Sequence, residues 1–491
     1  MVAQRSGIKH IVQLMLENRS FDQMLGFLYA EQNNLSPAGQ EFDGLTGNES
    51  CPDPSGREVK VFRIESSSPH AYLMPGGDPG EGFYNTNTQL FGTAHPAASA
   101  RPSNKGFVTN FKTAIASDLA KHFADTLPGT VPSEIMGAYA PEALPVLSAL
   151  ARGYAVCDRW FASVPTQTVP NRAFAAAATS QGRLDNHVKS FTCQSIFGRL
   201  SSNNTDWAIY GYNRSPLTRT DFHDTLYADS SHYGLFPEFV RRAATGQLPA
   251  YTFLEPSWSS DGNSQHPNYN VAAGERLIRD VYRAVRASPA WPDTLLLITY
   301  DEHGGNYDHV APPDTAVPPD DTRGEFDDFN FKRFGLRIPA VLISPRIPAG
   351  TVFRPSSGTI DHTSVLKTIE ELWDVPPLTK RDAAAPSLQA VVSLHAPRAD
   401  DPLHGVVAPS FDEPHPHAAR PSKLEQLHAW RVSQLPMPNE HGYYEHGDHE
   451  HGPHAPLSAA LSDRAALHGY IEGRMARWDS FLRARHNRSP K

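Results

Sequence analysis

The chain has 491 residues, of which 39% are hydrophobic, so it can bury a large core as one long α/β unit or as two or three domains. Its formal net charge of −9 results from 44 basic and 53 acidic residues, and the Lys and Arg residues form no evident cluster. A nucleic-acid partner is therefore not expected, because phosphate backbones are bound by clustered cations.

Cysteine content and apolar runs restrict the class of protein further. Cys51, Cys157 and Cys193 are too few for a disulfide framework, although one bridge is possible, and no spacing resembles a Cys-rich zinc site. No apolar run reaches the roughly 18 to 20 residues of a membrane helix, so we expect no transmembrane segment. No secretory signal is recognisable. We therefore expect a cytoplasmic protein, or one secreted without a recognisable leader or as a mature form.

Strand and helix patterns alternate along most of the chain. We expect strands at residues 8–16, 208–212, 251–256, 293–300 and 338–347, and helices at 143–152, 272–288 and 362–373. Residues 32–110 are polar and rich in Gly and Pro, and a loop of that length is usually functional or contains short hidden elements. The alternation predicts an α/β fold with a mostly parallel central sheet covered by helices on both faces.

The predicted domains are a catalytic domain over residues 1–395, an irregular His/Pro-rich segment over 396–456, and a C-terminal helix over 457–491 that docks on the catalytic domain. One apolar stripe along the last helix supports this docking. It consists of Leu467, Ile471, Met475, Trp478 and Leu482. The His-rich stretch 441–454 lacks the HExxH order, and its glycines and prolines favour a surface loop over a catalytic metal site.

Polar residues follow two of the expected strands directly. Glu17 and Asn18 follow the first strand, and Asp301 and Glu302 follow the strand at 293–300. Ligands of parallel sheets bind outside the carboxyl ends of the strands. Three carboxylates and an amide are hard oxygen donors that suit a divalent cation such as Ca, Mg, Mn or Zn. Either cluster alone could be a solvated loop or a helix cap, but two at equivalent strand ends favour a metal site.

The stretch "PTQTVPNR" presents a hydroxyl group between two prolines, just ahead of an expected helix. A helix N-terminus favours anions, so a phosphoryl or sulfuryl group could bind there. Thr168 could be a nucleophile activated by a metal, with Arg172 steadying the anion. It could equally be the cap of a proline-framed turn, and the spacing does not decide between the two.

Several histidines near these motifs are candidates for the acid that protonates a leaving oxygen. They are His266, His303, His309 and His362. The chain has 23 histidines, so any one of them could instead be structural, and His362 could simply cap its helix. The absence of GxSxG, Walker A and GxGxxG motifs argues against the usual α/β-hydrolase elbow and against nucleotide or dinucleotide chemistry.

Four motifs in this order resemble the phosphoesterase family of bacterial and plant non-specific phospholipases C and related acid phosphatases. They are "ENRSFDQMLG", "FASVPTQTVPNRAF", "TYDEHGGNYDHVAPP" and "DHTSVLKTIEELW", within residues 8 to about 375. The resemblance implies an alkaline-phosphatase-like α/β/α sandwich and metal-assisted phosphoryl transfer through a phospho-enzyme. It implies metal ligation by Glu17, Asn18, Asp301 and Glu302, with Thr168 as the nucleophile and His266 as an active-site histidine.

One position departs from the family pattern. The family often has a histidine in a "DPGHSF"-like stretch, where this chain has Glu81 in "GGDPGEGF". If Glu81 replaces that histidine, a leaving-group acid or a phosphate contact is missing or altered. We expect this departure to affect substrate choice and pH optimum more than the reaction class.

Three functions remain open from the sequence. The first is a phospholipase C that cleaves glycerophospholipids such as phosphatidylcholine and touches a membrane surface transiently. The second is an acid phosphatase acting on soluble phosphomonoesters. The third is an inactive relative that binds a metal or a partner, but the intact Glu-Asn, Thr and Asp-Glu set argues against it. Aromatic residues in the loops at 32–110 and 205–270 could give the first function its apolar rim, which favours it slightly.

Overall fold

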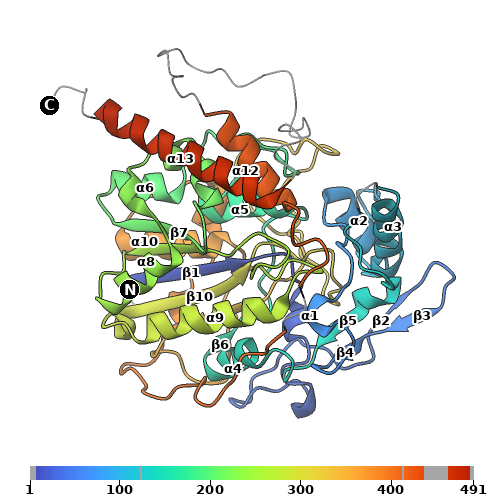
Figure 1. Cartoon of the computed structure of the whole chain (residues 1–491). Coiled ribbons are helices and arrows are strands. Elements are labelled where there is room, and N and C mark those ends of the chain that lie inside the picture. Colours follow the sequence, from blue (N-terminus) through green and yellow to red (C-terminus); the bar gives the residue numbers. More distant parts are fainter. Residues whose placement is uncertain (1–6, 122–123, 412–413, 436–462, 487–491) are drawn as a thin grey trace.

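The computed structural model describes residues 7–121, 124–411, 414–435 and 463–486. Its centre is one sheet (Figure 1) built from β1 (His10–Leu16), β6 (Ala155–Val156), β7 (Trp207–Gly211), β8 (Tyr233–Leu235), β9 (Tyr251–Glu255), β10 (Thr294–Tyr300), β11 (Ala340–Ile343) and β12 (Thr351–Val352). The strand order is β12-β6-β11-β10-β1-β9-β7-β8. All neighbouring pairs are parallel except the two that involve β11, so the expected mostly parallel sheet is confirmed.

The central strands β1 and β10 are mainly apolar and, apart from the half-buried His10 at the start of β1, buried, as expected of parallel strands covered on both faces. Gln13 is the buried polar residue within β1. Its amide donates to Thr299 Oγ1 at 3.2 Å and accepts a hydrogen bond from the Tyr251 hydroxyl at 2.9 Å. Gln13 is therefore tolerated in the core because its polar atoms are paired with the two neighbouring strands.

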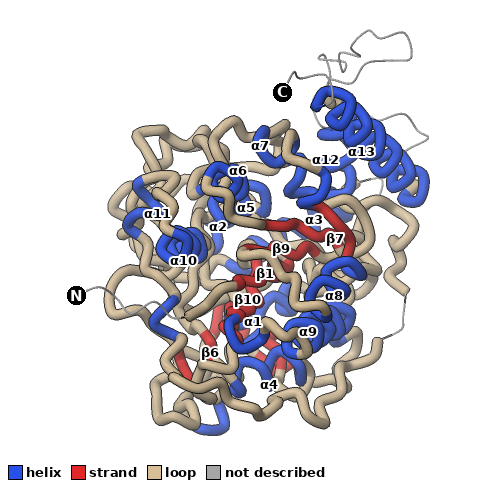
Figure 2. Tube along the Cα trace, turned by 90° about the vertical axis from the view of Figure 1, so that its left-hand side faces the viewer, coloured by secondary structure: helices blue, strands red, loops and turns tan. Residues whose placement is uncertain are grey.

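Helices cover both faces of the sheet (Figure 2), which confirms the predicted α/β/α sandwich. One face carries α8 (Phe236–Ala244) and α9 (Val271–Arg286), and the other carries α5 (Thr168–Ala177), α6 (Ile196–Ser202), α10 (Thr363–Trp373) and α11 (Lys380–Ala384). The remaining helices of this region are α1 (Phe21–Leu25), α4 (Pro145–Gly153) and α7 (His223–Leu226). The α5 helix begins at Thr168, so the hydroxyl that the sequence analysis placed just ahead of a helix belongs to the first residue of that helix.

The long polar region near the N-terminus contains short hidden elements. They are β2 (Ser50–Pro52), β3 (Glu58–Lys60), β4 (Phe62–Ile64), α2 (Phe83–Phe91) and, just beyond it, α3 (Phe107–Leu119). Strand β4 pairs with β5 (Gly137–Tyr139), and β2 pairs with β3. These elements lie together beside the main sheet (Figure 1) around a second apolar cluster that includes Phe107, Phe111 and Met136. Short 3-10 helices lie at Ala30–Gln32, Ala71–Leu73, Pro132–Met136, Leu217–Thr220, Ser230–His232, Trp291–Asp293 and Gln389–Val391.

Two helices form the C-terminal part, α12 (Lys423–Ser433) and α13 (Arg464–His486). The five residues of the predicted stripe on α13 are buried and pack against Ala429, Val432 and Leu435. Helix α12 lies inside the segment expected to be irregular, and the structure differs there because Ser422 and Glu425 form a capping box that starts a helix. The His-rich stretch 441–454 lies outside the described residues.

All three cysteines are free thiols, so the possible bridge is not formed. Within the ranges that the structure describes, no helix has both the length and the apolar content needed to cross a membrane.

A buried ion-pair network fixes α1 to the loop after β10. The Arg337 guanidinium donates to Asp22 Oδ1 at 2.7 Å and to Asp308 Oδ1 at 2.9 Å. His309 Nδ1 lies 2.7 Å from Asp22 Oδ2, and its Nε2 lies 3.4 Å from Asp43. Asp22, Asp308 and His309 are close enough to share a cation, but Arg337 already supplies one, so this cluster is a salt-bridge network.

The His309 network gives a pH-dependent prediction. Burial lowers the pKa of His309, but the Asp22 and Asp43 carboxylates outweigh burial and raise the pKa to about 10. The stabilisation by charged His309 is therefore complete below the unfolded pKa of about 6.5 and is lost as the pH rises towards 10. We expect His309→Gln to be less stable than wild type at pH 6, and this difference to shrink by at least about 1 kcal/mol by pH 9.5 in urea denaturation.

His95→Gln is the matched control, because His95 pairs with Asp327 at 3.1 Å while 68% of its side chain is exposed. Its difference from wild type should stay small at every pH. A His309→Gln difference that is constant between pH 6 and 9.5 would contradict the predicted charge on His309.

Candidate active site

The register of β1 and β10 brings the two predicted polar clusters together. Leu16 pairs with Tyr300, so Glu17 and Asp301 leave the sheet at the same level. The Asn18 backbone N–H donates to Asp301 Oδ1 at 2.9 Å, and the Glu302 N–H donates to the same oxygen at 2.8 Å. The sequence placed these four residues at equivalent strand ends, and the structure makes them direct neighbours.

The backbone around Asn18 depends on a glycine. Asn18 has a φ of 54° and Gly304 a φ of +62°, both in the left-handed region. A Cβ on Gly304 would lie 1.9 Å from the Asn18 carbonyl oxygen, so only glycine fits. Asn306 closes the same turn by donating to that carbonyl at 3.1 Å. The "HGGN" stretch therefore holds the Asn18 backbone in place.

Thr168 is the first residue of α5 and only 2% exposed. Its hydroxyl donates to Asn18 Oδ1 at 3.2 Å, which links the third motif to the first. The Asn171 amide holds the preceding loop through donated hydrogen bonds to the Val164 and Thr166 carbonyls at 3.1 and 2.9 Å. The nucleophile candidate therefore sits on a rigid turn.

Arg172 projects from α5 towards Asp301. Its Nε donates to Asp301 Oδ2 at 3.0 Å, and Nη2 donates to the Leu16 carbonyl at 3.1 Å. The guanidinium stacks over Trp258 with 4.7 Å between the guanidinium carbon and the ring centre. Nη1 is buried and has no hydrogen-bond partner. One donor of Arg172 is therefore left for an anion beside Thr168.

The carboxylates of this site are crowded and buried. Burial, and after it the neighbouring Asp301, raises the pKa of Glu17 well above its usual value. Burial, with Glu81 and Asp301, does the same for the pKa of Glu302, whose Oε1 is buried without a partner. Carboxylate oxygens and the Asn18 amide are donors of the kind that a divalent cation takes. The structure does not, however, bring Glu17, Asp301 and Glu302 together as a group with ligand atoms within 4.8 Å of one another.

Glu81, the position that departs from the family pattern, lies within the site. Its Oε2 accepts a hydrogen bond from Asn18 Nδ2 at 2.6 Å, and burial raises its pKa to about 8. Asp78, Glu81 and His266 form a cluster in which one ligand-type atom from each lies within 4.8 Å of the others. The His266 Nδ1 lies 3.1 Å from the Pro267 carbonyl, and burial lowers its pKa.

The predicted catalytic His303 lies behind Glu302. Its Nδ1 is 3.3 Å from Glu302 Oε2, and its Nε2 is 2.8 Å from Gln89 Oε1. The ring is 1% exposed, and burial lowers its pKa to about 3. His362 is placed similarly, with Nε2 at 2.7 Å from the Asp301 carbonyl. These contacts favour positioning of Glu302 and Asp301 over proton transfer to a leaving group.

Arg19 and Ser20, which complete the first polar cluster, hold the surrounding loops. Arg19 donates to the Gln265 carbonyl at 2.5 Å, the Met74 carbonyl at 2.6 Å and the His266 carbonyl at 3.1 Å. Ser20 caps α1 and donates to the Tyr307 carbonyl at 2.6 Å. The cluster at the end of β1 therefore orients the loop that carries His266.

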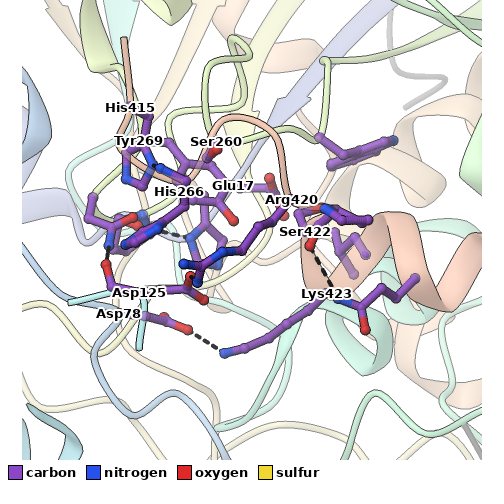
Figure 3. Close-up of a pocket in the computed structure, with 17 residues that line it drawn as sticks. Glu17, Asp78, Asp125, Ser260, His266, Tyr269, His415, Arg420, Ser422 and Lys423 are labelled. Carbon is purple, nitrogen blue, oxygen red and sulfur yellow. Dashed lines mark hydrogen bonds and ion pairs between the residues drawn. The ribbon is translucent and has the colours of Figure 1, made fainter. Parts of the chain in front are cut away.

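Glu17 and His266 face a pocket that also contains C-terminal residues (Figure 3). Asp78, Asp125 and Tyr269 line it from the catalytic region, and His415, Arg420 and Lys423 line it from the C-terminal segment. The sequence analysis missed these three C-terminal residues, because they lie outside the four motifs and no local pattern marks them. Only their position next to Glu17 in space reveals them.

A hydroxyl held by an asparagine among buried carboxylates, at the carboxyl edge of a parallel sheet, fits an ester hydrolase with a side-chain nucleophile. The model of the Phosphoesterase family matches residues 8–376. The chain therefore belongs to the phosphoesterase family and is a phosphoester hydrolase.

Several curated proteins are similar over most of their length. Non-specific phospholipase C6 of Arabidopsis thaliana is 37% identical over 420 residues, which cover 81% of this chain and 75% of that protein. Non-specific phospholipase C3 of the same plant is 37% identical over 425 residues, 81% of this chain and 76% of that protein. Phospholipase C A of Mycobacterium tuberculosis is 29% identical over 414 residues, 75% of this chain and 73% of that protein.

Solved structures are less similar to this chain than these curated proteins are. The lipoteichoic acid synthase LtaP from Listeria monocytogenes has a TM-score of 0.33 and 12% identity, with 51% of this chain and 70% of that chain covered. A protein in the alkaline phosphatase superfamily from Vibrio parahaemolyticus has a TM-score of 0.32 and 15% identity, with 49% of this chain and 64% of that chain covered.

The contact between Gly304 and Asn18 predicts that adding one methyl group at position 304 lowers both activity and stability. We expect Gly304→Ala to lower phosphoester hydrolysis more than tenfold and to destabilise the fold, because the Asn18 backbone must move. Gly129→Ala is the matched control, since Gly129 also has a positive φ of +86° but nothing within 4 Å of its Cβ position. The control should lose about 1 kcal/mol in denaturant melts and keep its activity. Equal activity of the two variants would refute the role of Gly304.

Proposed function

We propose that this hydrolase is a phospholipase C that cleaves a glycerophospholipid into diacylglycerol and a phosphorylated head group. The observation that carries the proposal is the Thr168 hydroxyl at 3.2 Å from Asn18 Oδ1, within a shell of buried carboxylates. The names of relatives that are 37% identical over 81% of the chain support the lipid substrate.

Glu17, Asn18, Asp301 and Glu302 would hold a divalent metal ion in this proposal. The raised pKa values of Glu17 and Glu302 and the unpartnered Glu302 Oε1 support this assignment. When bound, such an ion lowers the pKa of a nearby hydroxyl and offsets the charge of the phosphate.

The protein's own residues then carry out the transfer in two steps. Thr168 Oγ attacks phosphorus, the Thr168–phosphorus bond forms, and the bond to the diacylglycerol oxygen breaks. The proton of Thr168 passes by way of His266 to the departing alkoxide, because the Nδ1 contact with Pro267 leaves Nε2 free. The free Nη1 of Arg172 binds a phosphate oxygen. Water then cleaves phospho-Thr168, which releases the phosphorylated head group and restores the hydroxyl.

A lipid substrate requires transient contact with a membrane surface. Leu119 and Val131 flank the segment that carries the pocket residue Asp125, and 59% and 48% of these apolar residues are exposed. We propose that they touch the lipid surface while the head group enters the pocket.

Paired turnover tests the proposal directly. We expect release of phosphocholine from phosphatidylcholine vesicles to exceed hydrolysis of p-nitrophenyl phosphate, measured side by side on purified protein. Thr168→Ala should lose at least about 10³-fold in both assays, because it removes the attacking oxygen. Thr168→Ser is the matched control and should retain measurable turnover, because it keeps a hydroxyl at the same place.

Each other outcome would change the conclusion. Hydrolysis of the soluble monoester alone would identify a phosphatase on the same core. Full activity of Thr168→Ala would remove Thr168 from the mechanism. Absence of turnover on either substrate would favour the inactive, binding relative.

Metal removal gives a second test. We expect exhaustive chelation to abolish turnover and to lower the melting temperature, because the like-charged carboxylates then repel one another. Adding Ca²⁺, Mg²⁺, Mn²⁺ or Zn²⁺ singly should restore both properties with the native ion, and Glu302→Gln should need a higher concentration of it. Full turnover by protein shown by elemental analysis to be metal-free would reject this site.

A further inference from the structure

The C-terminal segment that precedes and begins α12 lines the pocket that Glu17 and His266 face (Figure 3). His415, Arg420, Ser422 and Lys423 contribute to its lining together with Glu17 and His266. This segment lies beyond residues 8–376, the part that the family model matches, and beyond the predicted catalytic domain. The pocket is therefore completed by residues that lie beyond the part of the chain matched by the family model.

We propose that Lys423 binds the phosphate group of the substrate and thereby determines which phosphoesters this site accepts. The proposal rests on the proposed function, because it assigns a role to Lys423 at that same site. Lys423 is the first residue of α12, and its ammonium group contacts Asp78 in the pocket.

The charge of the pocket is the first argument. The catalytic region presents Glu17, Asp78 and Asp125, and the buried Glu81 lies behind them. These carboxylates repel a phosphate anion. Among the described residues that line the pocket, the lysine and arginine side chains are Lys423 and Arg420, both from the C-terminal segment. An incoming phosphate is therefore attracted to that segment.

The position of Lys423 relative to the nucleophile is the second argument. Lys423 contacts Asp78, and Asp78 lies in the cluster with Glu81 and His266. Glu81 in turn accepts from Asn18 at 2.6 Å, and Asn18 accepts from Thr168 at 3.2 Å. This series of contacts places the Lys423 ammonium group on the same side of the fold as the Thr168 hydroxyl that would attack the phosphate.

The accessibility of Lys423 is the third argument. Although the ammonium group pairs with Asp78, 66% of the Lys423 side chain is exposed. The Asp78 carboxylate raises the pKa of Lys423, so the side chain stays charged. The Lys423 side chain is therefore reached from solvent, while its ammonium group lies in the pocket beside Asp78.

The helix that carries Lys423 is anchored firmly. Ser422 and Glu425 form its capping box, and Glu425 lies 2.7 Å from His468 of α13. Arg431 of α12 is buried, pairs with Asp221 and donates to the Val188 carbonyl at 3.0 Å. Lys423 is therefore held in place by the packed C-terminal helices rather than by a loose tail.

Kinetics of Lys423→Met provide the first test. We expect its KM for the phosphoester to rise about tenfold while kcat changes less than threefold, the loss typical of one charged contact. The inhibition constant of inorganic phosphate should rise by a similar factor, and Lys423→Arg should recover most of the loss. Lys367→Met is the matched control, because Lys367 lies on α10, pairs with Glu371 at 3.5 Å and does not line the pocket.

A purely structural ion pair with Asp78 is the competing explanation, and a double-mutant cycle separates the two. We would measure the binding of inorganic phosphate by calorimetry for wild type, Lys423→Met, Asp78→Asn and the double variant. If Lys423 binds phosphate, Lys423→Met weakens binding about tenfold both in the wild-type protein and in the Asp78→Asn variant. If the effect vanishes when Asp78 is replaced, Lys423 only neutralises Asp78 and the proposal is wrong.

This experiment also separates the inference from the proposed function. Phosphate binding by calorimetry needs no turnover, so it tests Lys423 even if the lipid assay fails. Unchanged phosphate affinity and unchanged KM in a folded Lys423→Met protein would overturn the inference while the phospholipase C activity stands.

Discussion

The parallel pairing of β1 with β10 is the constraint on which the rest of the site depends. Their register makes Leu16 the partner of Tyr300, and the next residue of each strand is a carboxylate, Glu17 or Asp301. Both are buried, so the fold concentrates negative charge where water cannot disperse it. The Thr168 hydroxyl, the Arg172 guanidinium and the loop that carries His266 are all arranged around this charge.

Buried charge is treated differently in the two acidic clusters of the structure. Around Asp22 and Asp308, Arg337 and His309 satisfy the carboxylates, and the cluster only ties α1 to its neighbours. Around Glu17 and Glu302 the pairing is incomplete, since Glu302 Oε1 has no partner. This incomplete pairing supports the proposed ion site beside Thr168, whereas the fully paired cluster stabilises the fold.

The pocket combines residues from the part of the chain that the family model matches with residues that lie beyond it. By the sequence resemblance, Glu81 is expected to stand where the family often has a histidine, and its carboxyl group offers no positive charge to a phosphate. Lys423 and Arg420 supply positive charge from the C-terminal segment. The carboxyl group of Glu81 and the ammonium group of Lys423 both set the charge that a phosphate meets in this pocket. We expect both to affect substrate choice more than the reaction class.

The sequence alone determined the longer strands of the central sheet, the α/β class, the apolar stripe of α13 and the neighbouring polar ends of β1 and β10. Each of these follows from local pattern, because burial on both faces of a strand or along one stripe of a helix selects residues at fixed spacing. Tertiary structure decided that His303 supports Glu302, that α5 starts at Thr168, and that Lys423 enters the pocket. These depend on contacts between residues far apart in the chain, such as Lys423 with Asp78, and no local spacing encodes such a distance.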